Sequence, residues 1–354
     1  MKTAYRTFFA AGLAALLSTS AGYARSRQPA APVFYPPAPD DPHIQYLTSF
    51  SSEEGLQGQR KFYTFIVGTE KVQRPILKPY GIAESPGKWY IADTIASAIE
   101  IADLNKKRLR YFQPNSEGSI RLPINIAVDG DGTRYVTDTG RNQVLVYKGD
   151  TYIGAIGKTG EINPVGIGLS KSRIYVSDVK GHCVRVYDKG SRNQLFTFPK
   201  SGTGLNAQLY SPTNLTVDTQ GNVYVCDTGA FRVTMYDADG KYIRTFGRQG
   251  LEPGTFARPK GVAVDREGRL YVADAATQVV QLFDPQGHLL MYFGNPLSGT
   301  GDSTCMPAGI AVDYDNLGQF QKFVAPNFSV EYLVMVVNQF GGHKIDVFGF
   351  GHKK

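Results

Sequence analysis

The chain repeats one three-residue pattern six times: a proline, one variable residue, and then a glycine or an asparagine that opens a strand. The six copies begin at Pro79, Pro123, Pro164, Pro212, Pro259 and Pro307. The spacings between them are 44, 41, 48, 47 and 48 residues. A period of about 40–50 residues with several short strands in each unit is typical of a β-propeller. The repeat therefore predicts an all-β fold, a six-bladed β-propeller.

Each repeat carries four short strands, and the fifth repeat shows them most clearly, at residues 261–265, 270–274, 279–283 and 289–293. β-branched and aromatic residues dominate these stretches, as half-buried strands require. In the first five repeats an aspartate follows the proline by 14 or 15 residues: Asp93, Asp138, Asp178, Asp227 and Asp274. We expect these carboxylates to cap the turn that follows, since Asp side chains in turns accept hydrogen bonds from nearby backbone amides.

The sixth repeat has only three strands, at residues 309–313, 333–338 and 344–348. Residues 43–50 resemble the outer strand 242–246 of the fourth repeat. The sequence therefore predicts that this N-terminal strand completes the last blade and closes the ring, which removes an exposed strand edge.

The last repeat also holds an insert of about 16 residues between its first two strands, containing Phe320, Phe323, Phe328 and Tyr332. We interpret it as a packed structural insert that forms a short amphipathic helix. A partner-binding knob is the alternative.

The first 24 residues have the order of a cleaved secretory signal. Lys2 and Arg6 precede an apolar stretch from Phe8 to Leu17, and small residues follow. The stretch is too short to span a bilayer, so we expect no transmembrane segment. Residues 25–42 contain six prolines and are expected to form a Pro-rich linker, either a stiff tether or an ordered arm on the surface. The propeller is predicted over residues 43–354, and the mature protein is expected in the periplasm or outside the cell.

Three cysteines occur: Cys183, Cys226 and Cys305. Cys226 ends an apolar strand and is expected to be buried. Cys183 lies at the equivalent turn of the preceding repeat, so a bridge between the two is an open alternative.

The turns after the second strands carry a family resemblance. Residues 138–144 read Asp-Thr-Gly-Arg-Asn-Gln-Val, and residues 227–233 read Asp-Thr-Gly-Ala-Phe-Arg-Val. These resemble the NHL repeat, whose usual form is Asp-Thr-Gly-Asn-His-Arg-Val. The resemblance runs from Leu77 to the C-terminus and implies a six-bladed propeller. It does not imply one function, because NHL rings host enzymes, nucleic-acid binders and scaffolds.

No catalytic residue, metal ligand or cofactor is assigned from the sequence. His182 and His343 fall where the NHL pattern carries its ordinary histidine, and the variable residues of the six openings are expected to face the channel mouth. These are Tyr80, Ile124, Val165, Thr213, Lys260 and Ala308. The set is mostly apolar and offers no cluster of zinc ligands.

A basic face is the candidate binding surface. The loops before the first strands and after the second strands are expected to share one face of the ring, with the candidate site residues Arg141, Lys180, Arg232, Arg258 and Lys260, and Tyr80 beside them. Removal of Lys2 and Arg6 with the signal lowers the net charge from +7 to +5, a modest basic bias. Export argues against a nucleic acid and leaves a protein partner or an acidic polymer.

These observations favour an exported, non-enzymatic and monomeric propeller that acts as a protein-binding or scaffold module. An accessory role in an envelope or extracellular electron-transfer system is the narrower form of this hypothesis. The alternative is a metal-dependent lyase or lactonase of the NHL-type propeller class.

Overall fold

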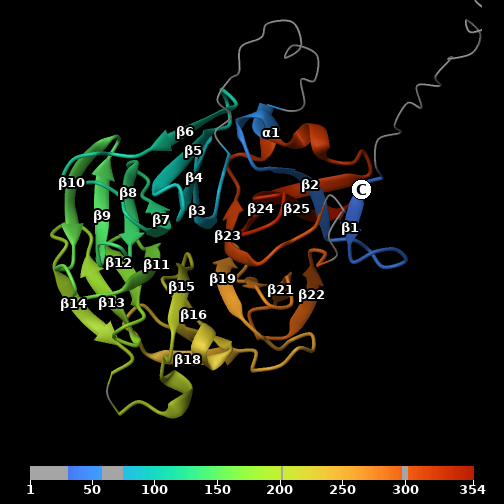
Figure 1. Ribbon diagram of the computed structural model, residues 1–354. Helices are drawn as coiled ribbons and strands as arrows, with labels where there is room; N and C mark the ends of the chain where they lie inside the picture. Colours follow the sequence, from blue (N-terminus) through green and yellow to red (C-terminus); the bar gives the residue numbers. More distant parts are fainter. Residues whose placement is uncertain (1–30, 58–74, 201, 297–301) are drawn as a thin grey trace, which may run out of the picture. The chain divides into compact units, whose positions relative to one another are not determined.

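Six antiparallel sheets, five of four strands and one of five, stand around a central axis (Figure 1). The computed structural model describes residues 31–57, 75–200, 202–296 and 302–354. Residues 32–354 form one compact unit. The predicted signal peptide lies outside the described residues. No helix among those residues is long and apolar enough to cross a membrane.

The first five blades each use four consecutive strands. Their bounds are β3 (Pro79–Ser85), β4 (Lys88–Asp93), β5 (Ala98–Asp103) and β6 (Arg108–Phe112); β7 (Pro123–Val128), β8 (Thr133–Asp138), β9 (Gln143–Lys148) and β10 (Thr151–Ile156); β11 (Pro164–Leu169), β12 (Arg173–Asp178), β13 (Cys183–Asp188) and β14 (Gln194–Phe198); β15 (Pro212–Val217), β16 (Val223–Asp227), β17 (Arg232–Tyr236) and β18 (Tyr242–Phe246); and β19 (Pro259–Val264), β20 (Leu270–Asp274), β21 (Val279–Phe283) and β22 (Leu289–Phe293). The predicted number of blades is confirmed.

The sixth blade joins both ends of the compact unit. Its sheet has the order β1-β2-β25-β24-β23, with β1 at Val33–Tyr35, β2 at Ile44–Phe50, β23 at Pro307–Asp313, β24 at Phe328–Asn338 and β25 at Ile345–Lys353. β2 pairs with β25 from Ile44 opposite Phe350 to Phe50 opposite Ile345. The N-terminal strand therefore lies at the predicted place in the last blade.

β1 was not predicted as a strand, because it lies within the Pro-rich stretch 25–42. It pairs with β2 as a fifth strand, and two aromatic side chains explain its attachment. The Phe34 ring lies 5.3 Å from that of Phe328, and the Tyr35 ring lies 6.2 Å from that of Phe293. The ordered-arm alternative thus holds for residues 33–35, and the last blade begins ten residues before the predicted boundary at 43.

The first strands line the axis and contact one another in the order β3, β7, β11, β15, β19, β23 and back to β3. The glycine of the opening pattern permits this approach. A Cβ on Gly309 would lie 2.2 Å from the carbonyl oxygen of Tyr80, and one on Gly166 would lie 2.4 Å from that of Thr213. The pattern therefore exists because neighbouring first strands meet backbone against backbone.

The core lies between adjacent blades. At the junction of the first and last blades, the buried Trp89 ring stacks between Phe50, 6.0 Å away, and Phe320, 5.0 Å away. Trp89 also donates its Nε1 hydrogen to Oδ2 of Asp313, at 2.6 Å. This interface joins an N-terminal strand, the first blade and the insert of the last blade.

The insert packs as predicted, but its local structure differs. It forms two short 3-10 turns, η3 (Leu317–Gln319) and η4 (Gln321–Phe323), and β24 extends back to Phe328. The predicted amphipathic helix is therefore wrong. Gln45 of β2 explains part of the geometry, because its side chain binds the backbone of Phe323 and Ala325 at 3.0 and 3.1 Å. The other helical elements are α1 (Glu53–Gln57), η1 (Leu205–Ala207) and η2 (Thr228–Ala230).

The three cysteines Cys183, Cys226 and Cys305 are free, so the bridge between Cys183 and Cys226 is not formed. Cys226 is buried, as predicted, within a cluster that includes Val272 and Phe283. Burial raises the pKa of its thiol to about 12. This thiol is therefore a packing group of the core.

Candidate functional site

Two sets of loops share one face of the ring. They are the connections into the first strand of each blade and the turns between the second and third strands. The aspartates that end the second strands hold the two sets together. Oδ2 of Asp93 accepts the amide hydrogens of Leu77 and Lys78, while its Oδ1 accepts those of Ile95 and Ala96. We call this surface the loop face.

The predicted capping of the following turn is confirmed for Asp93, Asp138, Asp178 and Asp274. Asp227 differs, because its two oxygens accept hydrogen bonds only from the preceding loop among the described residues, at Tyr210 and Ser211. The hydrogen bonds to the preceding loop were not predicted. They explain why an acidic side chain recurs at a buried position, since a carboxylate can satisfy several amides at once.

The predicted basic residues divide into three groups. Arg141 donates to the carbonyl oxygens of Glu117 and Ser119, and Arg232 donates to those of Leu205 and Gln208. Both guanidinium groups therefore hold the loops in place. Lys180 and Arg258 are exposed on the loop face.

Lys260 is buried, contrary to its predicted place on an exposed basic surface. Its Nζ donates to Oε1 of Gln339 at 2.9 Å and lies 5.2 Å from the centre of the Tyr80 ring. Burial, together with the charges of Arg258 and Lys78, lowers the pKa of Lys260 to about 8. The side chain is therefore a polar contact between blades, and Tyr80 is its half-buried neighbour.

His182 and His343 do not meet at a metal site. His182 has a φ of +50°, and the equivalent turn positions Ser97, Asn142, Phe231 and Gln278 have the same left-handed conformation. Its Nδ1 lies 2.5 Å from the carbonyl oxygen of Tyr210. Among residues 31–57, 75–200, 202–296 and 302–354, no group of three or more His, Cys, Asp or Glu side chains is placed to hold a metal ion.

The exposed apolar residues of the loop face were not predicted. Thirteen large hydrophobic side chains of the described chain are exposed. Seven belong to the loop face, and three of these are more than 60% exposed. The seven are Leu77, Ile95, Leu122, Leu205, Tyr210, Leu251 and Phe340.

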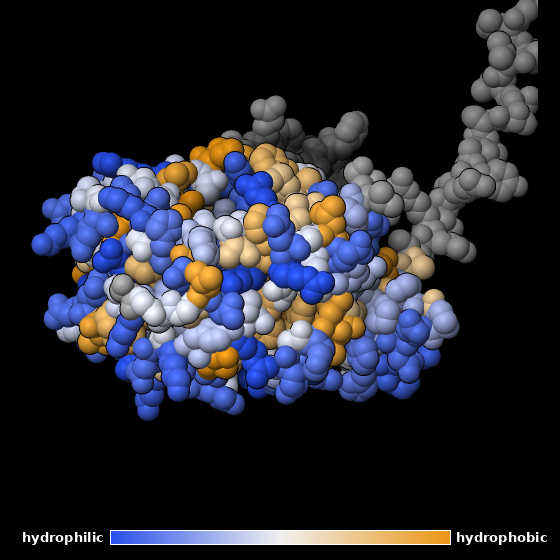
Figure 2. All heavy atoms as spheres, turned by 90° about the horizontal axis from the view of Figure 1, so that it is seen from below, coloured by the Kyte–Doolittle hydropathy of each residue, from blue (hydrophilic) through white to orange (hydrophobic). Residues whose placement is uncertain are grey.

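The rest of the described surface differs from the loop face. Five exposed hydrophobic residues lie on the outer strands, namely Ile153, Leu195, Ile243, Leu290 and Tyr292, and Phe323 alone lies on the opposite face. Figure 2 views the ring from its edge and shows hydrophobic residues in small patches between hydrophilic ones. The loop face thus holds the largest share of exposed apolar side chains.

The loop face also exposes more cationic than anionic side chains. Among its described residues, six cationic side chains are exposed: Arg121, Lys158, Lys180, Lys200, Arg248 and Arg258. Three carboxylates are exposed in these loops outside α1, those of Glu117, Glu161 and Glu252. The loop face therefore combines apolar anchors with an excess of positive charge.

The central channel is a second candidate site. It forms a cavity of about 320 Å³ between the first strands of the blades. The six variable residues predicted at its mouth are absent from the wall of this cavity, which consists of residues two to five positions beyond each proline. A β-bulge between Pro79 and Gly81 contributes to the difference, since it shifts which residues of β3 face the axis.

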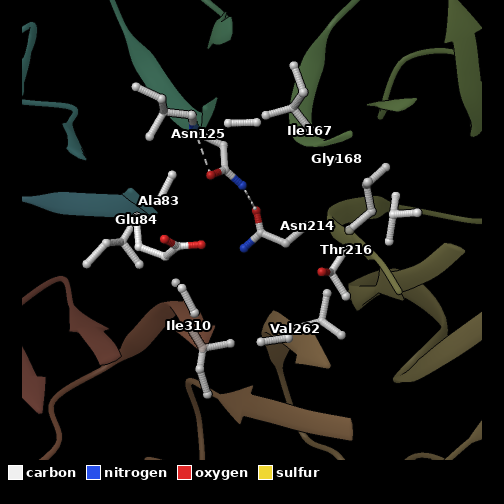
Figure 3. Close-up of a pocket in the computed structure, with 18 of the residues that line it drawn as sticks. Ala83, Glu84, Asn125, Ile167, Gly168, Asn214, Thr216, Val262 and Ile310 are labelled. Atoms are coloured by element: carbon white, nitrogen blue, oxygen red, sulfur yellow. Dashed lines mark hydrogen bonds between the residues drawn. The ribbon is translucent and has the colours of Figure 1, made fainter. Parts of the chain in front are cut away.

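Four polar side chains line the channel among its aliphatic residues. Glu84, Asn125, Asn214 and Thr216 point into the cavity among aliphatic side chains (Figure 3). Asn125 donates through Nδ2 to Oδ1 of Asn214 at 2.9 Å, and Asn214 donates to the carbonyl oxygen of Ala308 at 3.0 Å. Burial and the charges of Asp313 and Asp315 raise the pKa of Glu84 to about 7, against a smaller opposing effect of Arg266.

Comparisons with known proteins give a likeness of fold. No family model matches the chain, and no curated protein matches it. A solved streptogramin B lyase has a TM-score of 0.54 and 14% identity, over 78% of this chain and 84% of the lyase. A structure of a protein of unknown function from Bacteroides thetaiotaomicron has a TM-score of 0.54 and 18% identity, over 77% of this chain and 70% of its own.

A chain of the nidogen/laminin complex has a TM-score of 0.52 and 18% identity, over 71% of this chain and 92% of its own. At such identities the likeness concerns the fold alone, because one propeller architecture serves unrelated functions. The structure and these comparisons together place the chain among the six-bladed β-propellers.

Proposed function

We propose that this chain is a non-enzymatic binding module that docks an acidic protein segment through its loop face. One observation carries the proposal: seven of the thirteen exposed large hydrophobic residues gather on this face, together with six exposed cations. The seven come from five of the six blades, so a partner that lies across this face would contact several of them, and exposed apolar surface rimmed by polar groups is typical of protein-binding sites. The excess of cations over carboxylates selects a partner of opposite charge.

The loop face has the parts that an interface needs. Tyr210 and Phe340 offer aromatic surface, and Leu205 and Leu251 offer aliphatic surface at more than 70% exposure each. Buried aromatic and aliphatic anchors supply most of the affinity of an interface, while charges at its edge mainly govern encounter rate and specificity. The aspartate-held loops present these anchors from a rigid scaffold.

The NHL assignment belongs to the same proposal. It is supported by the Asp-Thr-Gly turns and by the left-handed conformation at His182, where the NHL pattern carries its histidine. Export rests on the order of residues 1–24. The narrower hypothesis of an envelope or electron-transfer accessory rests on the Pro-rich segment alone.

The structural comparisons do not distinguish a binding function from a catalytic one. The nidogen/laminin structure is a complex of proteins, and the streptogramin B lyase is an enzyme. The loop face therefore carries the proposal, and bound zinc or calcium in the purified protein would support the lyase or lactonase alternative instead.

A synthetic acidic polymer tests the loop face directly. We expect the chain to be retained on immobilised poly(Glu,Tyr), a random copolymer of carboxylates and aromatic rings, more strongly than on poly(Glu). Replacement of Ile95 and Leu251 by Ser is expected to weaken binding to poly(Glu,Tyr) about tenfold or more, since each buried aliphatic anchor contributes about 1.5–3 kcal/mol. Replacement of Arg121 and Arg258 by Glu is expected to abolish retention on both polymers at low salt.

The matched control replaces Ile153 and Leu290 by Ser, because these are exposed hydrophobic residues of outer strands. This variant is expected to bind like the wild type. Equal losses in the control and loop-face variants would contradict a specific loop-face site. Retention that is independent of Arg121 and Arg258 would contradict the selection of an acidic partner.

A further inference from the structure

The central channel departs from the symmetry of the ring at one titratable position. Glu84 lies five residues after the proline of its blade and opposite Trp89 of the neighbouring strand. The register-equivalent residues in the other blades are all aliphatic: Val128, Leu169, Val217, Val264 and Val312. All six positions line the same cavity. Glu84 therefore puts a carboxylate at one of six equivalent wall positions, and the other five are apolar.

Three more polar residues depart from the repeat in the same cavity. Asn125 and Asn214 stand where the other four blades have glycine, and Thr216 stands where they have alanine or glycine. The architecture of the ring requires none of these side chains, since the other blades close without them. Figure 3 shows that the four groups point toward a shared space from β3, β7 and β15.

The Glu84 carboxylate has no hydrogen bond or ion pair with any other residue that the structure describes. Glu84 is half-buried, and the partial loss of water around a carboxylate without a partner is unfavourable. A ligand that supplies a positive charge would offset this cost. The amide oxygens of Asn125 and Asn214 already accept hydrogen bonds, from the amide of Ile126 and from Asn125 Nδ2. The site therefore offers one free anion rather than a set of free oxygen ligands.

This donor set favours an organic cation over a metal ion. Calcium takes six to eight oxygen ligands in proteins, whereas an ammonium group needs one anion and a few acceptors. The surrounding wall includes Ile82, Ile126, Ile167, Val262 and Ile310. These aliphatic side chains suit an apolar body attached to the cation, and a cavity of about 320 Å³ lies at the small end of ligand sites.

We propose that the central channel binds a small organic ammonium ligand, with the Glu84 carboxylate holding its cationic group and the aliphatic wall enclosing its apolar body. This goes beyond the loop-face function, because it places a small-molecule site on the axis of the ring. The Thr216 hydroxyl, which also points into the cavity, orients the ligand.

The charges around Glu84 favour a cationic ligand. Asp313 and Asp315 add negative potential at Glu84, and Arg266 opposes them. Asp313 is engaged by Trp89 and by the amide and side chain of Asn316, so Glu84 is the acceptor that faces the cavity.

Benzylamine is a suitable probe, and benzyl alcohol is its neutral counterpart. By calorimetric titration of the full chain at pH 8, we expect benzylamine to bind with a Kd of about 1 mM or tighter. Benzyl alcohol should bind at least tenfold more weakly. Glu84→Val places in the first blade the residue found in four of the others, and it should weaken benzylamine binding at least tenfold without lowering the melting temperature. Glu331→Gln, at an exposed glutamate outside the channel, should bind like the wild type.

The pH dependence gives an independent readout. The ionised fraction of a carboxyl with a pKa of about 7 rises about tenfold between pH 6 and pH 8, so affinity for benzylamine should rise by the same factor in the wild type and stay level in Glu84→Val. The proposal is overturned if the wild type does not bind benzylamine, or if Glu84→Val binds it equally well. Stoichiometric calcium binding that is lost in Glu84→Val, without benzylamine binding, would overturn it in favour of a metal site.

Discussion

A chain that lacks residues 1–51 is expected to aggregate or to fail to fold. The deletion removes β2, whose Ile44, Leu47 and Phe50 are buried in the last blade. Each such side chain contributes about 1.5–3 kcal/mol on burial, so about 5–9 kcal/mol is lost, against total stabilities of about 5–15 kcal/mol for folded proteins. The deletion also exposes β25 as an unpaired edge, which favours edge-to-edge aggregation.

Two shorter deletions serve as controls, measured by thermal unfolding and size-exclusion chromatography. A chain without residues 1–31 keeps both β1 and β2 and should match the full chain. A chain without residues 1–41 loses only β1 and should be folded but less stable. If the chain without residues 1–51 melts at the temperature of the full chain, closure by β2 is not what holds the ring together.

Replacement of Glu100 is expected to change the pH dependence of stability. Glu100 lies on β5 and is fully buried. Burial and the neighbouring charge of Asp93 raise its pKa to about 10, from 4.5 in the unfolded chain. Between these values the folded state holds one proton more than the unfolded state, so the free energy of unfolding falls as pH rises.

The expected size of this effect is about 4 kcal/mol between pH 5 and pH 8, at about 1.4 kcal/mol for each pH unit. Glu100→Leu removes the titrating group, and Leu145 fills the equivalent position of the second blade. In urea unfolding, the free energy of unfolding of the variant should therefore increase relative to that of the wild type as pH rises from 5 to 8. A constant difference between the two at every pH would contradict the assignment of the proton to Glu100.

The repeat predicts most of the fold because the ring imposes the same local requirements on every blade. The prolines start the first strands, the glycines allow those strands to meet, and the aspartates bind loop amides in five of the six blades. The resemblance of residues 43–50 to an outer strand placed β2 correctly for the same reason. β1 was not predicted because its pairing depends on contacts of Phe34 and Tyr35 with residues 294 and 258 positions away.

The candidate site was predicted only in part. The loop face follows from strand order, but Lys260 turns inward to Gln339, and its direction depends on packing between blades. Glu84 was detectable in the sequence as the only acidic residue among six equivalent strand positions. It was missed because the bulge after Pro79 makes the later residues of the strand, rather than the variable residue of the opening, line the channel.

Amide hydrogen exchange in the presence of poly(Glu,Tyr) tests whether the loop face is the docking surface. In the full chain, we expect slower exchange in the presence of the polymer at residues 94–97, 117–122, 205–210 and 251–258, with no change in the hairpins at 129–133, 218–222 and 265–269 of the opposite face. Slower exchange in those opposite hairpins, or equal protection on both faces, would contradict it.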